Sequence, residues 1–247
     1  MTESVIFTQK DDIASVVLNQ NSNLNAFGTD LVEGLHATLD QAEQQQAKFW
    51  VLKANGKGFS GGLDLSGLES ETDGDLLLRL VRIEQLLQRV RHSSLHSCVM
   101  VHGACYGAAA DLVLCCRFRV GSPDARFLMP GLRFGIVLGT RRLRDTLGET
   151  AAYRLLNRQT PFKANEALDT GFLNAVADQS GWDQLIQEQV HRLSIFAQSS
   201  IADRVSSLTP DTRDADMTAL VTSVLNGSIK LRMQQYVAEV SASKKKQ

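Results

Sequence analysis

Cysteine and proline are both scarce in this chain, which has only four of each among its 247 residues. The cysteines form neither a CxxC pair nor a zinc-ligand pattern, and the five histidines show no HExxH spacing. We therefore expect no metal site. Because the cysteines lie in apolar stretches, we expect them to be small buried thiols of a reducing compartment. They are Cys98, Cys105, Cys115 and Cys116.

An excess of charge of one sign is also lacking, because 26 Lys and Arg residues stand against 27 Asp and Glu residues. This balance argues against a protein that acts mainly on nucleic acid or on an anionic membrane surface. No apolar run approaches the ~20 residues that span a bilayer. Residues 1–12 carry three acidic side chains and no apolar signal-peptide core, so we expect no secretory signal and a cytoplasmic location.

The chain does contain a large apolar fraction, 43% of its residues, which suffices for a substantial core and excludes a largely disordered protein. Two β-patterned runs at the start predict a hairpin, and apolar periodicity then predicts helices and strands in alternation. Strands are expected at 4–9, 13–18, 48–53, 98–101 and 117–121, and helices at 31–42, 76–90, 107–116 and for most of the chain from 140 onward. Strands separated by helices predict an α/β core, and no linker divides the chain.

Residues 56–61 form a literal GxGxxG directly after the strand expected at 48–53. A dinucleotide site needs these glycines to open a helix whose N-terminus faces the pyrophosphate. Here an acidic loop with poor helical periodicity follows, and no returning parallel strand lies at the expected distance. A nucleotide-dependent oxidoreductase is therefore our weakest hypothesis, behind a plain surface turn.

Two glycine-rich turns, at 59–65 and 102–112, each follow an expected strand. Small residues let a ligand approach the backbone, and the free N–H groups at a helix start carry partial positive charge. One N–H group from each turn could hold the oxygen of a thioester as it becomes an enolate. Losing one such donor typically costs about 2.7–4 kcal/mol of transition-state stabilisation, so the pair predicts a catalytic oxyanion site.

Four blocks of the sequence resemble, in the same order, the crotonase (enoyl-CoA hydratase/isomerase) superfamily. Residues 18–19 with 24–27 resemble the family's LNRP…NAL segment, and residues 56–65 resemble its GxGxxFxAGxDL loop. Residues 102–112 resemble NGxxxGGGxEL, and residues 156–176 resemble the family's helix–turn–strand region. One block alone is weak evidence, whereas four collinear blocks are specific.

The resemblance implies an α/β fold of the crotonase type, in which residues 1–195 form a spiral of ββα units. Residues 196–247 would form a helical C-terminal trimerisation region. The resemblance also implies an acyl-CoA substrate, so that coenzyme A enters with the substrate and no metal or redox cofactor is needed. The expected assembly is a homotrimer or a dimer of trimers, with no nucleic-acid or membrane partner.

By motif position, the resemblance implies that the N–H groups of Leu63 and Ala108 form the oxyanion hole. It places Ala26 at the adenine end of CoA and residues 63–66 along the pantetheine and thioester. Leu63 and Ala108 replace the more usual Ala and Gly, which preserves both backbone donors, but the bulk of Leu63 is expected to alter the preferred acyl shape. The implied substrate-binding residues are Ala26, Leu63, Asp64, Leu65, Ser66 and Ala108.

The carboxylates decide the chemistry, and here the sequence departs from the family. Asp111 stands where the hydratases carry their first catalytic Glu, and on a helix it shares a face with Gly107 and Ala108. We predict that it is the base, although an Asp in a first helical turn also interacts favourably with the helix dipole without any catalytic role. Gly131 occupies the place of the second Glu. A positioned acid or base contributes typically ~10²–10⁴-fold, so we expect a single-base isomerase rather than an efficient hydratase.

Other activities remain open at this point, because the family runs hydration, decarboxylation and thioester hydrolysis through one enolate. A non-catalytic acyl-CoA-binding subunit is a further alternative, since one acid is absent and the other is shortened from Glu to Asp. Arginines between 117 and 144 could attract the CoA phosphates or an acidic acyl group, but a solvated face or interface pairs are the favoured interpretation. Arg133 is expected to come nearest the acyl pocket. The seven are Arg117, Arg119, Arg126, Arg133, Arg141, Arg142 and Arg144.

Overall fold

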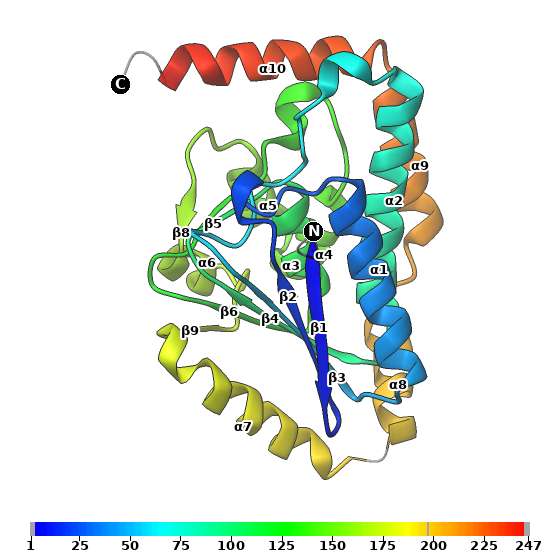
Figure 1. The fold of residues 1–247 in the computed structure, drawn as a ribbon, viewed down its shortest axis with the longest axis vertical. Helices are drawn as coiled ribbons and strands as arrows, with labels where there is room; N and C mark the ends of the chain where they lie inside the picture. Colours follow the sequence, from blue (N-terminus) through cyan, green and yellow to red (C-terminus); the bar gives the residue numbers. More distant parts are fainter. Residues whose placement is uncertain (1–2, 197, 245–247) are drawn as a thin grey trace.

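The computed structural model describes residues 3–196 and 198–244, and a six-stranded sheet forms its centre (Figure 1). The first two strands pair antiparallel as the predicted hairpin, and the second strand and those after it run parallel. In sheet order the strands are β1 (Val5–Lys10), β2 (Ile13–Leu18), β3 (Phe49–Ala54), β4 (His96–Val101), β6 (Phe118–Gly121) and β9 (Ala175–Val176). The predicted α/β class is confirmed.

Helices bury both faces of this sheet, as parallel strands require. Trp50 and Leu52 of β3 pack in the larger core, whereas the alternating Phe49 and Val51 pack on the opposite face with Trp182. The larger core is covered by α1 (Thr29–Gln44), α2 (Asp73–His92) and α3 (Ala108–Cys115), and the opposite face by α7 (Trp182–Ser194).

A second sheet of three short strands, which the sequence pattern does not predict, lies beside the first. Its strands are β5 (Ala104–Tyr106), β7 (Arg126–Leu128) and β8 (Phe162–Lys163). Phe127 and Phe162 stack with ring centroids 5.4 Å apart, and Phe172 packs on both rings. Because β5 lies inside the second glycine-rich turn, this small sheet fixes the position of that turn.

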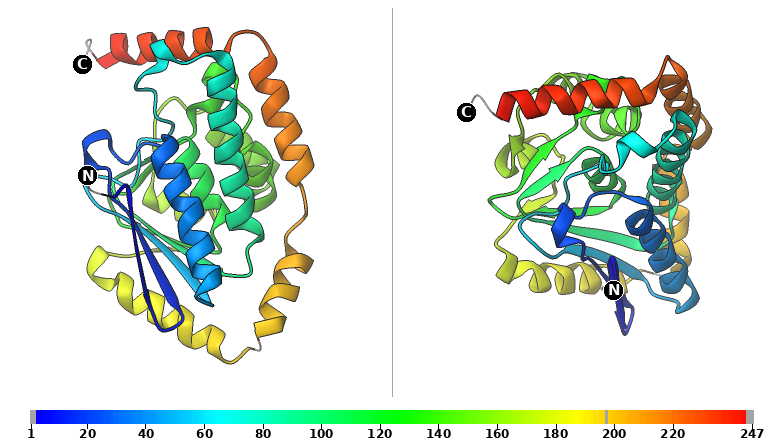
Figure 2. Two further views of the ribbon diagram at one scale, coloured as in Figure 1. Left: turned by 45° about the vertical axis from the view of Figure 1, so that its right-hand side comes forward. Right: turned by 45° about the horizontal axis from the view of Figure 1, so that its top comes forward.

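The chain after β7 is mostly helical, as predicted, and its last helix returns to the core. Figures 1 and 2 show α9 beside α2, while α10 crosses one end of the molecule and packs on α2 and η3. The elements are η3 (Pro130–Phe134), α4 (Thr140–Leu147), α5 (Glu149–Leu156), α6 (Ala164–Asp169), η4 (Gln179–Gly181), α8 (Gln198–Leu208), α9 (Arg213–Leu225) and α10 (Ile229–Lys244), with η1 (Asn21–Asn23) and η2 (Leu68–Ser70) earlier in the chain.

The predicted boundary between residues 195 and 196 falls between α7 and α8. Residues 1–2, 197 and 245–247, which the two predicted regions include, lie outside the described residues. The division into a core and a trimerisation region stays a prediction.

Local sequence explains two of the helices that carry the site. Helix α2 begins with a capping box, in which Thr72 Oγ1 accepts from Asp75 N (3.2 Å) and Asp75 Oδ2 accepts from Thr72 N (2.8 Å). Helix α3 is buried on every side and accordingly contains Ala, Leu, Val and Cys, with Asp111 as its single charged residue. A buried carboxylate is costly unless it is paired, so Asp111 demands an explanation.

All four cysteines are buried and free, as predicted. Within residues 3–196 and 198–244, no helix is both long and apolar enough to cross a bilayer. Nor do those residues bring three or more His, Cys, Asp or Glu side chains together in a group that could hold a metal ion.

Candidate active site

The two glycine-rich turns lie directly against each other. Phe59 N donates to His102 O (2.8 Å), Ser60 N to Ala104 O (2.9 Å) and Tyr106 N back to Ser60 O (3.1 Å). These hydrogen bonds connect the first turn to β5, and Ser60 and Cys105 form a parallel β-bridge. The two turns therefore form one rigid unit, although residues 66–101 separate them in the sequence.

Gly62 makes the close approach possible. Its φ of +91° suits glycine, and a Cβ atom there would lie 2.6 Å from Tyr106 O and 3.5 Å from Gly107 N. Gly107 also has a positive φ, of +53°, and a Cβ on it would lie 3.9 Å from Gly62 Cα. The backbone of the second turn thus occupies the space that a side chain on Gly62 would need, whereas Gly107 is favoured by its positive φ.

The residues that follow these glycines, Leu63 and Ala108, line the same cavity. Neither backbone N–H donates a hydrogen bond to any described residue. Ala108 is the first residue of α3, where an amide has no acceptor within the helix. Two free donors at one cavity form an arrangement that can bind the oxygen of a carbonyl that gains negative charge.

The cavity is small and mainly apolar, with a volume of about 90 Å³. Side chains from distant elements form its walls, including Leu80 of α2, Phe134 of η3, Leu156 of α5 and Tyr236 of α10. Among the described residues that line it, Asp111 is the only charged one. The cavity can therefore hold a hydrocarbon chain beside a single carboxyl group.

Asp111 sits in the first turn of α3, and its N–H donates to Gly107 O (3.1 Å). Its side chain is buried, and Oδ1 has no hydrogen-bond partner among the described residues. Burial raises the pKa of Asp111 to about 7, because the ionised form loses its hydration, while Arg142 acts to lower this pKa and Glu84 to raise it. A carboxyl group with a pKa near neutrality can both accept and return a proton.

Gly131, at the place of the second family acid, also lines the cavity from within η3. A Cβ atom on Gly131 would lie 3.2 Å from Ile136 O, which is closer than an ordinary contact. Gly131 itself contributes no acid to the cavity lining.

The other predicted substrate-binding residues divide into two groups. Leu65 lines the cavity together with Leu63 and Ala108, whereas Ala26, Asp64 and Ser66 lie outside its lining. Asp64 Oδ1 accepts from Ser66 N (2.9 Å), which shapes the turn. Ala26 is buried next to Phe27, whose N–H donates to Gly62 O (2.7 Å). Asp64 and Ser66 thus support the first turn, and the contact of all three residues with CoA stays a prediction.

Six of the seven arginines have structural partners, in agreement with the interpretation favoured from the sequence. Arg117 and Arg119 donate to backbone carbonyls, for example those of Leu95 (2.7 Å) and Phe172 (2.8 Å). Arg133 does not line the cavity: it stacks over the Tyr236 ring, 5.1 Å from its centroid, and lies 3.3 Å from Glu239. Ion pairs to carboxylates also occupy Arg141, Arg142 and Arg144.

Sequence reasoning missed the parts of the site that come from far along the chain. Tyr236 reaches the cavity from α10, and Gly139 and Thr140 reach it from the start of α4. A Cβ atom on Gly139 would overlap Asp111 Oδ1, so this glycine is needed where the carboxyl group packs. No spacing within the sequence signals these contacts, because each depends on how whole elements pack.

The glycines at 56–61 open no helix, since the next α-helix, α2, begins only at Asp73. The geometry required for a dinucleotide site is therefore not met. What the fold and cavity define instead is an α/β protein whose two glycine-rich turns meet at one apolar cavity.

Comparison with known families agrees with this class. The family described as enoyl-CoA hydratase/isomerase matches residues 8–243, and the chain belongs to that family. The predicted superfamily and its fold are thereby confirmed.

The chain is also similar to individual proteins whose names refer to acyl-CoA chemistry. A crystal structure of a candidate enoyl-CoA hydratase/isomerase from Bordetella parapertussis is 36% identical, has a TM-score of 0.93, and the match covers 96% of this chain and 99% of that one. A probable enoyl-CoA hydratase of Bacillus subtilis is 28% identical over 77% of this chain and 75% of its own length. The human ethylmalonyl-CoA decarboxylase is 26% identical over 77% of this chain and 64% of its own length.

Proposed function

We propose that this protein is an acyl-CoA enzyme that moves the double bond of an enoyl-CoA, with Asp111 as its single carboxylate base. The observation that supports this most strongly is the cavity itself, which combines two free backbone donors with one carboxyl group. The N–H groups of Leu63 and Ala108 hold the thioester oxygen, and the acyl chain lies along the apolar wall. Coenzyme A enters as part of the substrate, and the chemistry needs no metal or redox cofactor.

In the forward reaction the Asp111 carboxylate removes a proton from the α-carbon of a 3-enoyl-CoA. The electron pair of that C–H bond forms a dienolate, whose negative oxygen accepts from the two backbone donors. Asp111, now protonated, returns the proton to the γ-carbon, and the double bond moves to the 2-position. Because the pKa of Asp111 is raised to about 7, one group can serve as base and then as acid near neutral pH.

Efficient hydration fits the cavity less well. A hydratase benefits from a second group that orients and deprotonates water, and Gly131 supplies no side chain there. The absence of one such group typically costs ~10²–10⁴-fold in rate. Weak hydratase activity is therefore the second candidate, and it shares the same enolate.

Decarboxylation is less favoured than isomerisation, although one group of relatives bears the name ethylmalonyl-CoA decarboxylase. A carboxylated acyl group would have to sit in a cavity whose described lining contains no Lys, Arg or His. Burying a second carboxylate beside Asp111 without a cation is strongly unfavourable. A purely hydrocarbon acyl chain is the better occupant.

Assembly as a homotrimer or a dimer of trimers belongs to the same proposal. Large apolar side chains are exposed in the C-terminal helices, among them Leu208, Leu225 and Leu231. Exposed large apolar side chains are common where subunits meet, so they are consistent with an interface in this part of the chain. Sedimentation of the full chain would report the number of subunits.

The proposed reaction predicts the outcome of a paired assay. Purified protein is given 3-enoyl-CoA and 2-enoyl-CoA of four to eight carbons, and isomerisation and hydration are measured separately. We expect isomerisation to dominate, with a kcat/KM that falls about 10²–10⁴-fold in Asp111→Asn. Robust hydration that survives Asp111→Asn would show that the assignment is wrong.

A further inference from the structure

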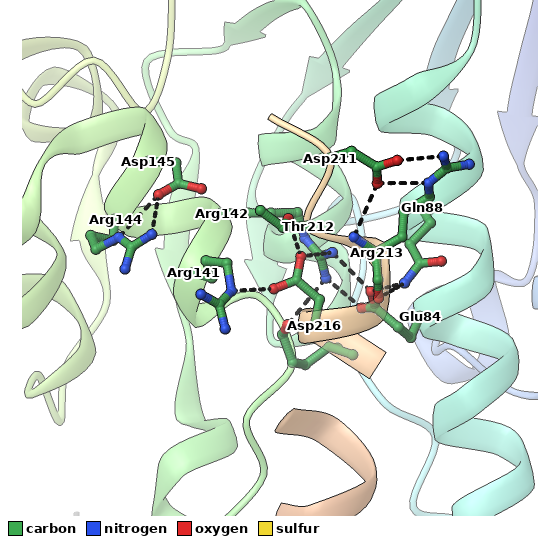
Figure 3. Close-up of polar contacts among 11 residues, drawn as sticks. Glu84, Gln88, Arg141, Arg142, Arg144, Asp145, Asp211, Thr212, Arg213 and Asp216 are labelled. Carbon is green, nitrogen blue, oxygen red and sulfur yellow. Dashed lines mark hydrogen bonds and ion pairs between the residues drawn. The ribbon is translucent and has the colours of Figure 1, made fainter. Parts of the chain in front are cut away.

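A buried ion-pair network lies next to the cavity without lining it. Figure 3 shows Arg142 of α4 between Glu84 of α2 and Asp216 of α9. The side chains of Glu84, Arg142 and Asp216 are 0%, 1% and 4% exposed. Three helices from separate parts of the chain thus meet at one guanidinium group.

Most of the network's polar atoms are satisfied. Arg142 Nη1 donates to Glu84 Oε1 (2.9 Å) and to Asp216 Oδ2 (3.2 Å), and Arg142 Nη2 donates to Glu84 Oε2 and to Leu138 O. Asp216 also accepts from Arg141 Nε (2.8 Å) and from Thr212 Oγ1 (2.7 Å). Buried ion pairs are nonetheless weak evidence for stability, because desolvation offsets much of their attraction. Their position relative to Asp111 suggests another use.

The start of α4 connects the network to Asp111. Gly139 is the N-cap residue of α4, and it packs so closely on the Asp111 carboxyl group that a Cβ atom there would overlap Oδ1. Arg142 lies three residues further on, in the first turn of the same helix. Its bonds to Glu84 and Asp216 therefore hold the helix end that touches Asp111.

Two charged groups act on Asp111, and two buried thiols interact with it without contributing charge. Arg142 on α4 favours the ionised carboxylate, and Glu84 on α2 disfavours it. The thiols of Cys105 on β5 and Cys115 on α3 are held neutral, since burial raises the pKa of each. The two charged neighbours of Asp111, Arg142 and Glu84, are thus bonded to each other, and they shift the pKa of Asp111 in opposite directions.

We propose that the Arg142–Glu84 pair is a positioning element for Asp111: it holds the start of α4 against the carboxyl group and balances the charge that this group experiences. The inference rests on the proposed function, because it assigns Asp111 as the base. Asp216 anchors the far side of Arg142 and acts on the guanidinium group rather than on Asp111.

Two matched variants test the pair, since each removes one carboxylate charge from Arg142. In Glu84→Gln, a negative neighbour of Asp111 is lost and the charge of Arg142 is less neutralised. Because both changes favour the ionised carboxylate, the acidic limb of the pH profile of kcat/KM should move to lower pH by about 0.5–1 unit. In Asp216→Asn, the limb should move less than half as far. Arg142→Gln should move it upward, and Arg142→Lys should restore the wild-type position.

A direct titration separates this inference from the proposed reaction. Infrared difference spectra of wild type against Asp111→Asn report the midpoint of the Asp111 carboxyl group without any substrate. If the midpoint moves downward in Glu84→Gln but isomerisation is not detected, the inference stands and the proposed reaction fails. If isomerisation is robust but Glu84→Gln and Asp216→Asn move the midpoint equally, or neither moves it, the inference is overturned. These two variants decide the matter even if Arg142→Gln does not fold.

Discussion

At the residue scale, the form of Asp111 that the proposed reaction needs is the form that least favours folding. Its carboxyl group is buried in a helix of otherwise apolar residues, and burial raises its pKa from an ordinary 3.8 to about 7. The folded state therefore binds this proton more tightly than the unfolded state does. The resulting stabilisation is complete below about pH 4 and is lost as the pH rises to about 7. Asp111 is thus least favourable for folding in the ionised form that the proposed reaction uses.

This linkage predicts that Asp111→Asn stabilises the protein while abolishing activity. The amide stays neutral, so the free energy of unfolding should rise by about 1–4 kcal/mol at pH 8 and by less at pH 5. Urea unfolding of both proteins at the two pH values measures the difference. An equal gain at both pH values would contradict burial as the cause of the raised pKa.

At the element scale, the two glycine-rich turns create the site because their backbones pack in direct contact. Gly62 has a positive φ and lies where Tyr106 O of the second turn leaves no room for a side chain. Its neighbour Gly61 has ordinary space, since a Cβ there would lie 3.7 Å from Leu24 Cβ. The two adjacent glycines thus differ sharply in what the structure requires of them.

The difference predicts contrasting effects of two neighbouring substitutions. Gly62→Ala should push the turns apart, lowering kcat/KM about 10²–10³-fold, as the loss of one oxyanion donor does, and lowering the free energy of unfolding by about 1–3 kcal/mol. Gly61→Ala should stay close to wild type in both. Steady-state kinetics and thermal unfolding of the pair provide the comparison, and equal damage from both would contradict the account.

The sequence alone predicts the long elements of the fold and the turns of the site. Helix α2 and strand β3 have strong apolar periodicity or a continuous apolar run, so their type is clear from local pattern. Strands β5, β7, β8 and β9 have two or three residues each, too few for any periodicity, and their pairing depends on tertiary packing. The second sheet was therefore beyond prediction, whereas the turn that contains β5 was not.

At the scale of the whole molecule, residues that are far apart in the sequence line one cavity. Leu63 comes from the first third, while Tyr236 comes from α10 and packs on Phe134, with ring centroids 5.0 Å apart. The contacts of Arg142 with Glu84 and Asp216 likewise join helices that are distant in sequence. Such long-range contacts leave no local trace in the sequence, which is why Asp111 and Leu63 were predicted but the role of Tyr236 and the partners of Arg142 were not.

The central claim is that the molecule gathers two backbone donors and one carboxylate around a thioester so that its α-proton becomes removable. The most direct measurement is exchange of the α-protons of a saturated acyl-CoA, such as butyryl-CoA, in D₂O, followed by proton NMR. This substrate has no double bond to move or hydrate, so exchange reports enolate formation alone. We predict exchange with the wild-type protein and a loss of about 10²–10⁴-fold in Asp111→Asn. Absence of exchange in the wild type, or exchange that Asp111→Asn leaves unchanged, would contradict the account.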